Sequence, residues 1–185
     1  MQRWLVGKVS RGFRDTINQA IINGNGVGQP LGFLNPAAGI PICDVSPITQ
    51  PSQFAIADLV MLKFEIPMSL QDGCVWLINQ RTAALLFTMS DAIGRPLLTA
   101  LPERAPGFVL AGSPIVLCSW MPNVEPGSTP ILFGNLKATY MIVDRRALTM
   151  TVDPYRAGWC TLFKFDCRLG GSVTCPNASR LLRIK

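Results

Sequence analysis

Six cysteines are the residues of this sequence best suited to nucleophilic or metal chemistry, and the chain contains no histidine. An enzyme could use a cysteine beside an aspartate, for example Cys160 or Cys167 near Asp166, but the spacing provides no base for a thiolate. Zinc sites usually contain paired cysteines or histidines, and no Cys-x-x-Cys pair is present. We therefore expect reduced, buried cysteines and a protein that is not an enzyme, with no catalytic residue, metal or cofactor.

The glycine-rich stretch at 23–34 is the second candidate for chemistry, because glycine loops can bind phosphate. It contains Gly24, Gly26 and Gly28, followed by Pro30. A phosphate-binding loop follows a strand and begins a helix, whereas this stretch follows a helical pattern, and no Lys-Ser or Lys-Thr comes after it. The stretch is interpreted as a structural loop that ends a helix.

The helix that this loop ends is predicted over residues 1–22. Its apolar residues recur at spacings of three and four, which is typical of an amphipathic helix. They are Leu5, Val6, Val9, Phe13, Ile17 and Ile21. The pattern starts without a capping residue, so the chain is expected to begin inside the helix.

The low fraction of charged residues and the uneven distribution of positive charge indicate two classes of partner, other protein chains and nucleic acid. The net charge is +6, with 49% apolar and 15% charged residues, and so little charge predicts that association covers part of the surface. Residues 144–185 contain eight basic and three acidic residues, a net charge of +5, which could face nucleic acid. Phe163 and Phe165 alternate with Lys164, however, and alternation places the aromatic rings on the other strand face, where they favour a core role.

No membrane span is expected. The longest uncharged run, 105–124, is divided by Pro106, Gly112, Pro114 and Pro122, and the first residues place charge inside any candidate signal segment. The protein is therefore expected to be soluble and intracellular, without a membrane partner.

The remaining elements combine helices and strands. We expect a mostly buried helix at 53–66 capped by Ser52, a strand at 74–78, a helix at 80–89 capped by Asn79, and an exposed loop at 91–107. Strands are predicted at 108–110, 113–119, 130–135, 139–143, 147–152 and 161–168, then a turn at Gly170-Gly171 and an apolar-basic segment at 178–184. This order indicates an α+β fold.

Five segments, taken in order, carry motifs that occur together in one protein family. They are IINGNGVGQPLGF at 21–33, VWLINQRTA at 75–83, DAIGRPL at 91–97, LAGSPIV at 110–116 with Met121-Pro122, and a closing set of ILFGN at 131–135, YMIVDRR at 140–146 and Asp153-Pro154-Tyr155. Together they resemble the major capsid proteins of tailed bacteriophages, which have the Hong Kong 97-type fold. The resemblance covers nearly the whole chain.

The resemblance implies an α+β architecture in two domains. An axial domain at 37–143 would contain a mixed sheet with flanking helices and would gather around fivefold and sixfold axes. A peripheral domain at 1–36 and 144–185 would combine the long helix with antiparallel closing strands. The family's N-terminal arm and extended hairpin loop precede the point where this sequence starts, so the chain is expected to lack them, and the cross-linking known in one branch cannot be carried over.

The function implied is a structural subunit of a bacteriophage or prophage icosahedral head. Its partners would be copies of itself, as pentamers or hexamers, and packaged DNA bound without sequence preference; its location would be the virion capsid, and the bacterial cytoplasm before assembly. Arg95, Asp153 and Arg156 are the candidates for ion pairs between subunits. The alternatives are a non-assembling prophage remnant, an encapsulin-type compartment shell, and, in another class, a basic nucleic-acid-binding protein.

Overall fold

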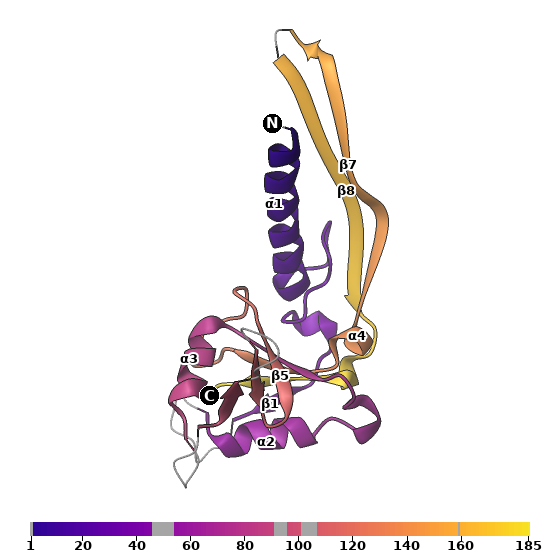
Figure 1. Ribbon diagram of the computed structural model, residues 1–185. Helices are drawn as coiled ribbons and strands as arrows, with labels where there is room; N and C mark the ends of the chain where they lie inside the picture. Colours follow the sequence, from indigo (N-terminus) through magenta and orange to yellow (C-terminus); the bar gives the residue numbers. More distant parts are fainter. Residues whose placement is uncertain (1, 46–53, 91–95, 101–106, 159) are drawn as a thin grey trace. The chain divides into compact units, whose positions relative to one another are not determined.

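The computed structural model describes residues 2–45, 54–90, 96–100, 107–158 and 160–185, and the chain divides into two compact units. Unit 1 comprises Met1–Asn35 and Met141–Ser172, and unit 2 comprises Pro36–Tyr140 and Val173–Lys185. Figure 1 shows the helix and long strands of unit 1 and the sheet and shorter helices of unit 2. The units are described separately below.

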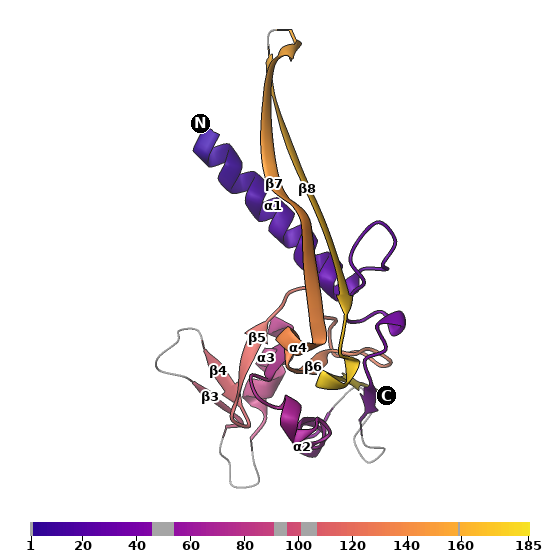
Figure 2. The ribbon, with the colours of Figure 1, turned by 90° about the vertical axis from the view of Figure 1, so that its right-hand side faces the viewer.

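Unit 2 is organised around a seven-stranded mixed sheet with the order β1-β9-β6-β2-β5-β4-β3. Its strands are β1 (Ile42–Asp44), β2 (Val75–Ile78), β3 (Leu98–Ala100), β4 (Phe108–Leu110), β5 (Ser113–Leu117), β6 (Ile131–Gly134) and β9 (Ser179–Arg183). β2 pairs in parallel with β5 and antiparallel with β6, while β9 pairs in parallel with β1 and antiparallel with β6. Figure 2 shows β3 and β4 at one end of this sheet.

Alternation along the central strands divides their side chains between two buried faces. One face carries Trp76, Ile78 and Phe133 into a single core cluster that also contains buried residues of two helices of the unit. The rings of Trp76 and Phe133 lie with their centroids 4.3 Å apart. Leu77 and Leu132 occupy the opposite face and are also buried. Because both faces are covered, these strands read in the sequence as continuous apolar runs.

The two helices that contribute to this cluster are α2 (Ile56–Phe64) and α3 (Gln80–Thr88). The predicted cap of α3 is confirmed, because the Asn79 side chain accepts a hydrogen bond from the Arg81 backbone N–H. Helix α2 begins later than expected: Ala55 is its N-cap, and the Ala55 N–H donates to the Asp58 carboxylate at 2.8 Å. The proposed cap, Ser52, lies outside the described residues.

Short elements complete unit 2. They are three 3-10 turns at Pro36–Ala38, Met68–Leu70 and Pro176–Ala178, and α4 (Leu136–Thr139). The expectation of a continuous exposed loop at 91–107 was wrong for residues 98–100, which form β3 and pair antiparallel with β4. Residues 91–95 and 101–106 of that loop lie outside the described residues.

Unit 1 contains a long helix, α1 (Gln2–Asn23), and a two-stranded ribbon of β7 (Tyr140–Ala157) and β8 (Cys160–Val173). The helix is confirmed over nearly its full predicted length. The strands predicted at 139–143 and 147–152 belong to one strand, so the gap expected between them was wrong. Gly170 and Gly171 do not form the predicted turn but lie inside β8, where extended backbone suits glycine as well as any residue.

The glycine-rich stretch closes the end of α1, as predicted. The Phe33 and Leu34 N–H groups donate to the carbonyls of Ile21 and Ile22, at 2.9 and 3.0 Å, so the returning chain lies against the last helical turn. A Cβ on Gly24 would collide with the Pro30 and Ala20 carbonyl oxygens, so the close approach requires glycine there. The glycines therefore serve helix termination, and the Gly24 N–H is already bonded to Ala20.

Unit boundaries differ from the predicted domain ranges at the carboxyl end. All of 144–185 was predicted to lie in one domain with α1, whereas Val173–Lys185 belong to unit 2, because β9 completes its sheet between β1 and β6. The assignment of the two units to peripheral and axial positions stays a prediction.

Candidate subunit-contact surfaces

The outer face of α2 is an exposed apolar surface of unit 2. Met61 and Phe64 are 66% and 73% exposed, Met68 in the following turn is 89% exposed, and Val60 is also exposed. Spacings of three and four residues place Val60, Met61 and Phe64 on one side of the helix, and Met68 lies beyond its end in the following 3-10 turn. The expectation of a mostly buried helix was therefore wrong: Leu59 and Leu62 are buried, but the opposite face of α2 is open and apolar.

Polar contacts fix the C-terminal end of α2 against the sheet. Glu65 caps the helix; its carboxylate accepts a hydrogen bond from the Cys43 thiol at 2.5 Å and lies 3.6 Å from Arg180 Nε. A cation at a helix C-terminus is favourable because the unpaired carbonyls concentrate negative charge there, and Arg180 also donates to the Glu65 backbone carbonyl. These contacts join α2 to β1 and β9, so the apolar face has a fixed orientation within unit 2.

The same contacts make Cys43 a poor nucleophile. Burial first, then the hydrogen bond to Glu65 and the charge of its carboxylate, raise the pKa of the Cys43 thiol to about 12. Burial also raises the pKa of the Cys74 thiol. A thiol with a raised pKa carries little thiolate at neutral pH. Among the described cysteines the expectation of burial holds for Cys74 only, and it was wrong for Cys43, Cys118, Cys167 and Cys175, which are partly exposed.

A second ion pair joins the outer strands of the sheet. Arg183 Nε and Nη2 donate to the two Asp44 carboxylate oxygens at 2.7 and 3.1 Å, in the parallel register that aligns β1 with β9. This bidentate hydrogen bond lowers the pKa of the Asp44 carboxyl. The pair holds β1, which is an edge strand of the sheet, in its register.

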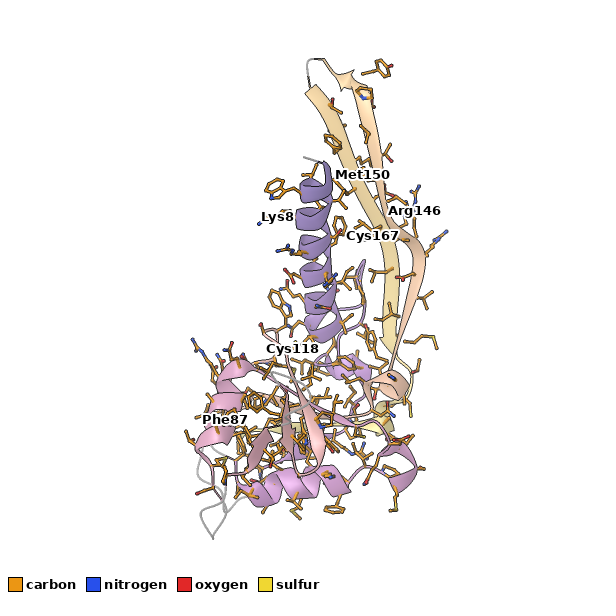
Figure 3. All side chains as sticks on the ribbon, viewed as in Figure 1. Lys8, Phe87, Cys118, Arg146, Met150 and Cys167 are labelled. Carbon is orange, nitrogen blue, oxygen red and sulfur yellow. The ribbon has the colours of Figure 1, made fainter. Side chains whose placement is uncertain are left out.

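The ribbon of unit 1 exposes a second apolar surface. Arg146 and Asp166 form an ion pair at 2.8 Å, which places these two even-numbered residues of β7 and β8 on the same face of the ribbon. Figure 3 shows Arg146 extending from β7 away from α1. The exposed apolar residues of this parity are Ile142, Leu148, Met150, Val152 and Leu162. A two-stranded ribbon is marginally stable in water, and apolar exposure along it indicates a surface that another chain covers.

Unit 1 also contains a cavity of about 830 Å³ between α1, the glycine-rich loop and the ribbon. Phe13 and Ile17 line it from the helix, and Val143, Cys167 and Leu169 from the ribbon. The lining is mainly apolar, and although Arg145 and Arg168 reach it, it includes no carboxylate.

The three predicted contact residues have different outcomes. Asp153 lies in β7, and its carboxylate accepts a hydrogen bond from the Tyr155 N–H at 3.0 Å. Arg156 lies in the same strand, but its side chain is outside the described set, and Arg95 lies outside the described residues altogether. The ion pairs proposed for them between subunits therefore stay predictions.

The hypothetical Asp166–Cys167 pair gains no support from the geometry. The Asp166 carboxylate binds Arg146, and Cys167 alternates onto the other face and lines the cavity. Phe163, Phe165 and Cys167 are partly buried, as predicted for a half-buried strand. Across the described residues, no group of three or more Cys, Asp or Glu is placed to hold a metal ion, and no helix is long and apolar enough to cross a membrane.

Sequence reasoning missed the α2 face. Phe54, Leu59, Val60, Leu62 and Phe64 give this segment apolar residues on every side, which favours complete burial. The charged residues Lys63 and Glu65 could have indicated that one side of the helix is exposed, because they flank that side. Lys63 Nζ donates a hydrogen bond to the Ala111 carbonyl at one edge, and the Glu65 carboxylate forms an ion pair with Arg180 at the C-terminal end.

Comparisons with known proteins find similarity to capsid proteins. The sequence profile described as the phage capsid family matches residues 1–184. The solved structure titled "Capsid of empty GTA particle computed with C5 symmetry" is 26% identical with a TM-score of 0.85, and the native GTA particle capsid is 27% identical with a TM-score of 0.84. Both alignments cover 100% of this chain, which spans 66% and 65% of those chains, slightly less than two thirds.

More distant structures share the fold. A chain of Gordonia phage Cozz is 16% identical, with a TM-score of 0.62 and coverage of 98% of this chain and 62% of that one. The SrpI encapsulin of Synechococcus elongatus PCC 7942 is 12% identical, with a TM-score of 0.72 and coverage of 99% and 65%. No curated protein sequence is significantly similar to this chain.

Proposed function

Because the chain belongs to the phage capsid family, we propose that it is a structural subunit of a bacteriophage or prophage head, whose copies associate with one another to form the shell. The fold prediction is confirmed: the chain has the Hong Kong 97-type α+β fold of the phage and GTA particle capsids. We infer this role from the exposed apolar surfaces of the described residues, which other copies of the chain would cover.

The observation that carries this proposal is the open apolar face of α2. A helix that buries Leu59 and Leu62 while exposing Met61, Phe64 and Met68 gains stability when the exposed side is covered. Burial of one such side chain contributes about 1.5–3 kcal/mol, so a few of them supply much of the free energy of a weak interface. Shells form through many such weak, repeated contacts.

We further propose that the partners of the chain are its own copies and packaged DNA, and that its location is the virion capsid. We include pentamers among the proposed assemblies because the two similar GTA particle capsids were computed with C5 symmetry. Unit 2 would lie around the symmetry axes and unit 1 at the periphery, with Arg95, Asp153 and Arg156 in ion pairs between subunits. The shell would enclose DNA, and its subunits would be present in the host cytoplasm before assembly.

The experiment is sedimentation velocity with negative-stain microscopy of the purified chain from about 1 to 100 µM. Pentamers, hexamers or closed particles that grow with concentration support the proposal. A strict monomer at the highest concentration contradicts it and favours the non-assembling remnant. The SrpI encapsulin is only 12% identical to this chain, so the similarity concerns the fold alone and supports no second function.

A further inference from the structure

Helix α1 presents a basic face with an aromatic residue at its amino end. At 100° per residue, Trp4, Lys8, Arg11 and Arg14 fall within one third of the helix circumference, and all four side chains are exposed. Trp4 is 66% exposed. Asp15 is the acidic residue on the same arc, so three cations and one carboxylate line this face over about three turns.

The basic face points away from the ribbon. Leu5, Val9, Phe13 and Ile17 on the opposite side of α1 are partly buried, and the last two line the cavity that the ribbon encloses. Figure 3 shows Lys8 extending from the side of α1 away from β7 and β8. The fold of unit 1 therefore fixes the apolar side of the helix inward and leaves the cations in solvent.

Ion pairing distinguishes this face from the basic carboxyl-terminal segment. Three arginines of that segment, Arg146, Arg180 and Arg183, are within 4 Å of Asp166, Glu65 and Asp44 respectively. Among the described residues, no ion pair involves Lys8, Arg11 or Arg14. The surplus of positive charge that the sequence places after residue 144 is thus partly neutralised, whereas that of α1 is available.

We propose that this face of α1 binds the phosphate backbone of double-stranded DNA. Cations without carboxylate partners, spaced along a straight helix, fit a row of phosphates, and an exposed indole can add contact with sugar or base edges. A lipid surface fits less well, because a membrane-bound helix inserts its apolar side, and here that side faces the ribbon. The proposal rests on the proposed shell function for its DNA, but the binding itself requires no shell.

The expected salt dependence follows from three phosphate contacts. Releasing counterions from three phosphates gives a slope of log K against log salt of about −2.7, so affinity falls about fortyfold between 50 and 200 mM salt. Anisotropy of a fluorescein-labelled 30-base-pair duplex measures this on the full chain. Using the Met61→Glu/Phe64→Glu background keeps self-association from contributing avidity.

The decisive comparison is between two triple variants of equal net charge. Lys8→Gln/Arg11→Gln/Arg14→Gln should weaken duplex binding at least tenfold and flatten the salt slope. Arg81→Gln/Lys137→Gln/Lys164→Gln, which removes three exposed cations elsewhere, should stay within threefold of the parent. Equal losses in both variants, no duplex binding at 50 mM salt, or tighter binding to anionic phosphatidylserine vesicles or to an RNA hairpin than to the duplex would overturn the proposal.

Sedimentation of the same preparations without the Met61 and Phe64 changes separates this proposal from the shell function. If the chain binds the duplex through α1 but does not self-associate, the DNA-binding proposal is supported and the proposed shell function is contradicted. If the chain self-associates but does not bind the duplex, only the DNA-binding proposal is contradicted.

Discussion

The indole Nε1 of Trp76 donates a hydrogen bond to the backbone carbonyl of Leu110 at 3.0 Å, which joins β2 to β4 across the intervening strand β5. Trp76 is completely buried and packs against Phe133 of β6. One side chain therefore ties together both halves of the sheet in unit 2.

Trp76→Phe should lower the free energy of unfolding by about 2–4 kcal/mol, because it removes buried volume together with the bond to Leu110. Urea unfolding followed by circular dichroism measures the change. Trp4→Phe, at a position that is 66% exposed, serves as the control and should stay within about 0.5 kcal/mol. Equal effects of the two substitutions would contradict the assigned role of Trp76.

Two buried threonines should respond to valine with opposite signs. The Thr139 hydroxyl shares a 2.5 Å hydrogen bond with the Ser179 hydroxyl and donates to the Asn135 carbonyl, so Thr139→Val should cost about 1–3 kcal/mol. The Thr82 hydroxyl is buried in α3 without a hydrogen-bond partner among the described residues, so Thr82→Val should be neutral or stabilising by about 1 kcal/mol. Thermal and urea unfolding of both variants test this, and a loss for Thr82→Val would sink the distinction.

Asp44→Asn should change the pH dependence of stability. The hydrogen bonds from Arg183 lower the pKa of the Asp44 carboxyl in the folded chain, so its stabilisation is present above the unfolded value of about 3.9 and is lost as pH falls through the lower folded value. The variant should therefore be less stable than the parent at pH 7, by a small margin because the pair is exposed.

Melting temperatures of both proteins from pH 7 down to pH 2 measure this difference. The two curves should converge as Asp44 becomes protonated. A difference that persists unchanged at pH 2 would show that the asparagine acts through packing instead.

Cys43 should resist alkylation in the folded chain. A pKa of about 12 instead of 9 reduces its thiolate about 1000-fold at pH 8, and the greater nucleophilicity of a more basic thiolate recovers part of this, leaving a rate about 30–50-fold lower. Iodoacetamide labelling with mass spectrometry, in buffer and in 8 M urea, gives the ratio for each cysteine. Glu65→Gln should accelerate labelling of Cys43, and an unchanged rate would mean that burial alone protects it.

The sequence predicted well those features that local chemistry decides. The spacing of Phe13, Ile17 and Ile21 defines α1, Asn79 caps α3, and Gly24 allows the chain to return against the helix end. Each depends on interactions within a few residues, which a pattern of residue types records directly.

Features that depend on distant partners were not predicted. Leu181 and Leu182 of β9 lie between β1 and β6. Leu181 is 139 positions from its partner Ile42 in β1 and 49 from its partner Leu132 in β6, and no local pattern reveals either pairing. Gly170-Gly171 has the composition of a turn, but pairing with β7 extends β8 through it. Phe64 resembles a core residue in the sequence, and only the position of the sheet shows that it faces outward.

The most direct test of a structural subunit joined through α2 is sedimentation velocity of the chain beside its Met61→Glu/Phe64→Glu variant at 50 µM. Val27→Glu, which places the same charge on an exposed apolar residue outside that face, is the control. If copies of the chain associate through the exposed face of α2, the parent and the control should sediment as oligomers and the double variant as a folded monomer. Oligomers of unchanged size in all three would contradict it.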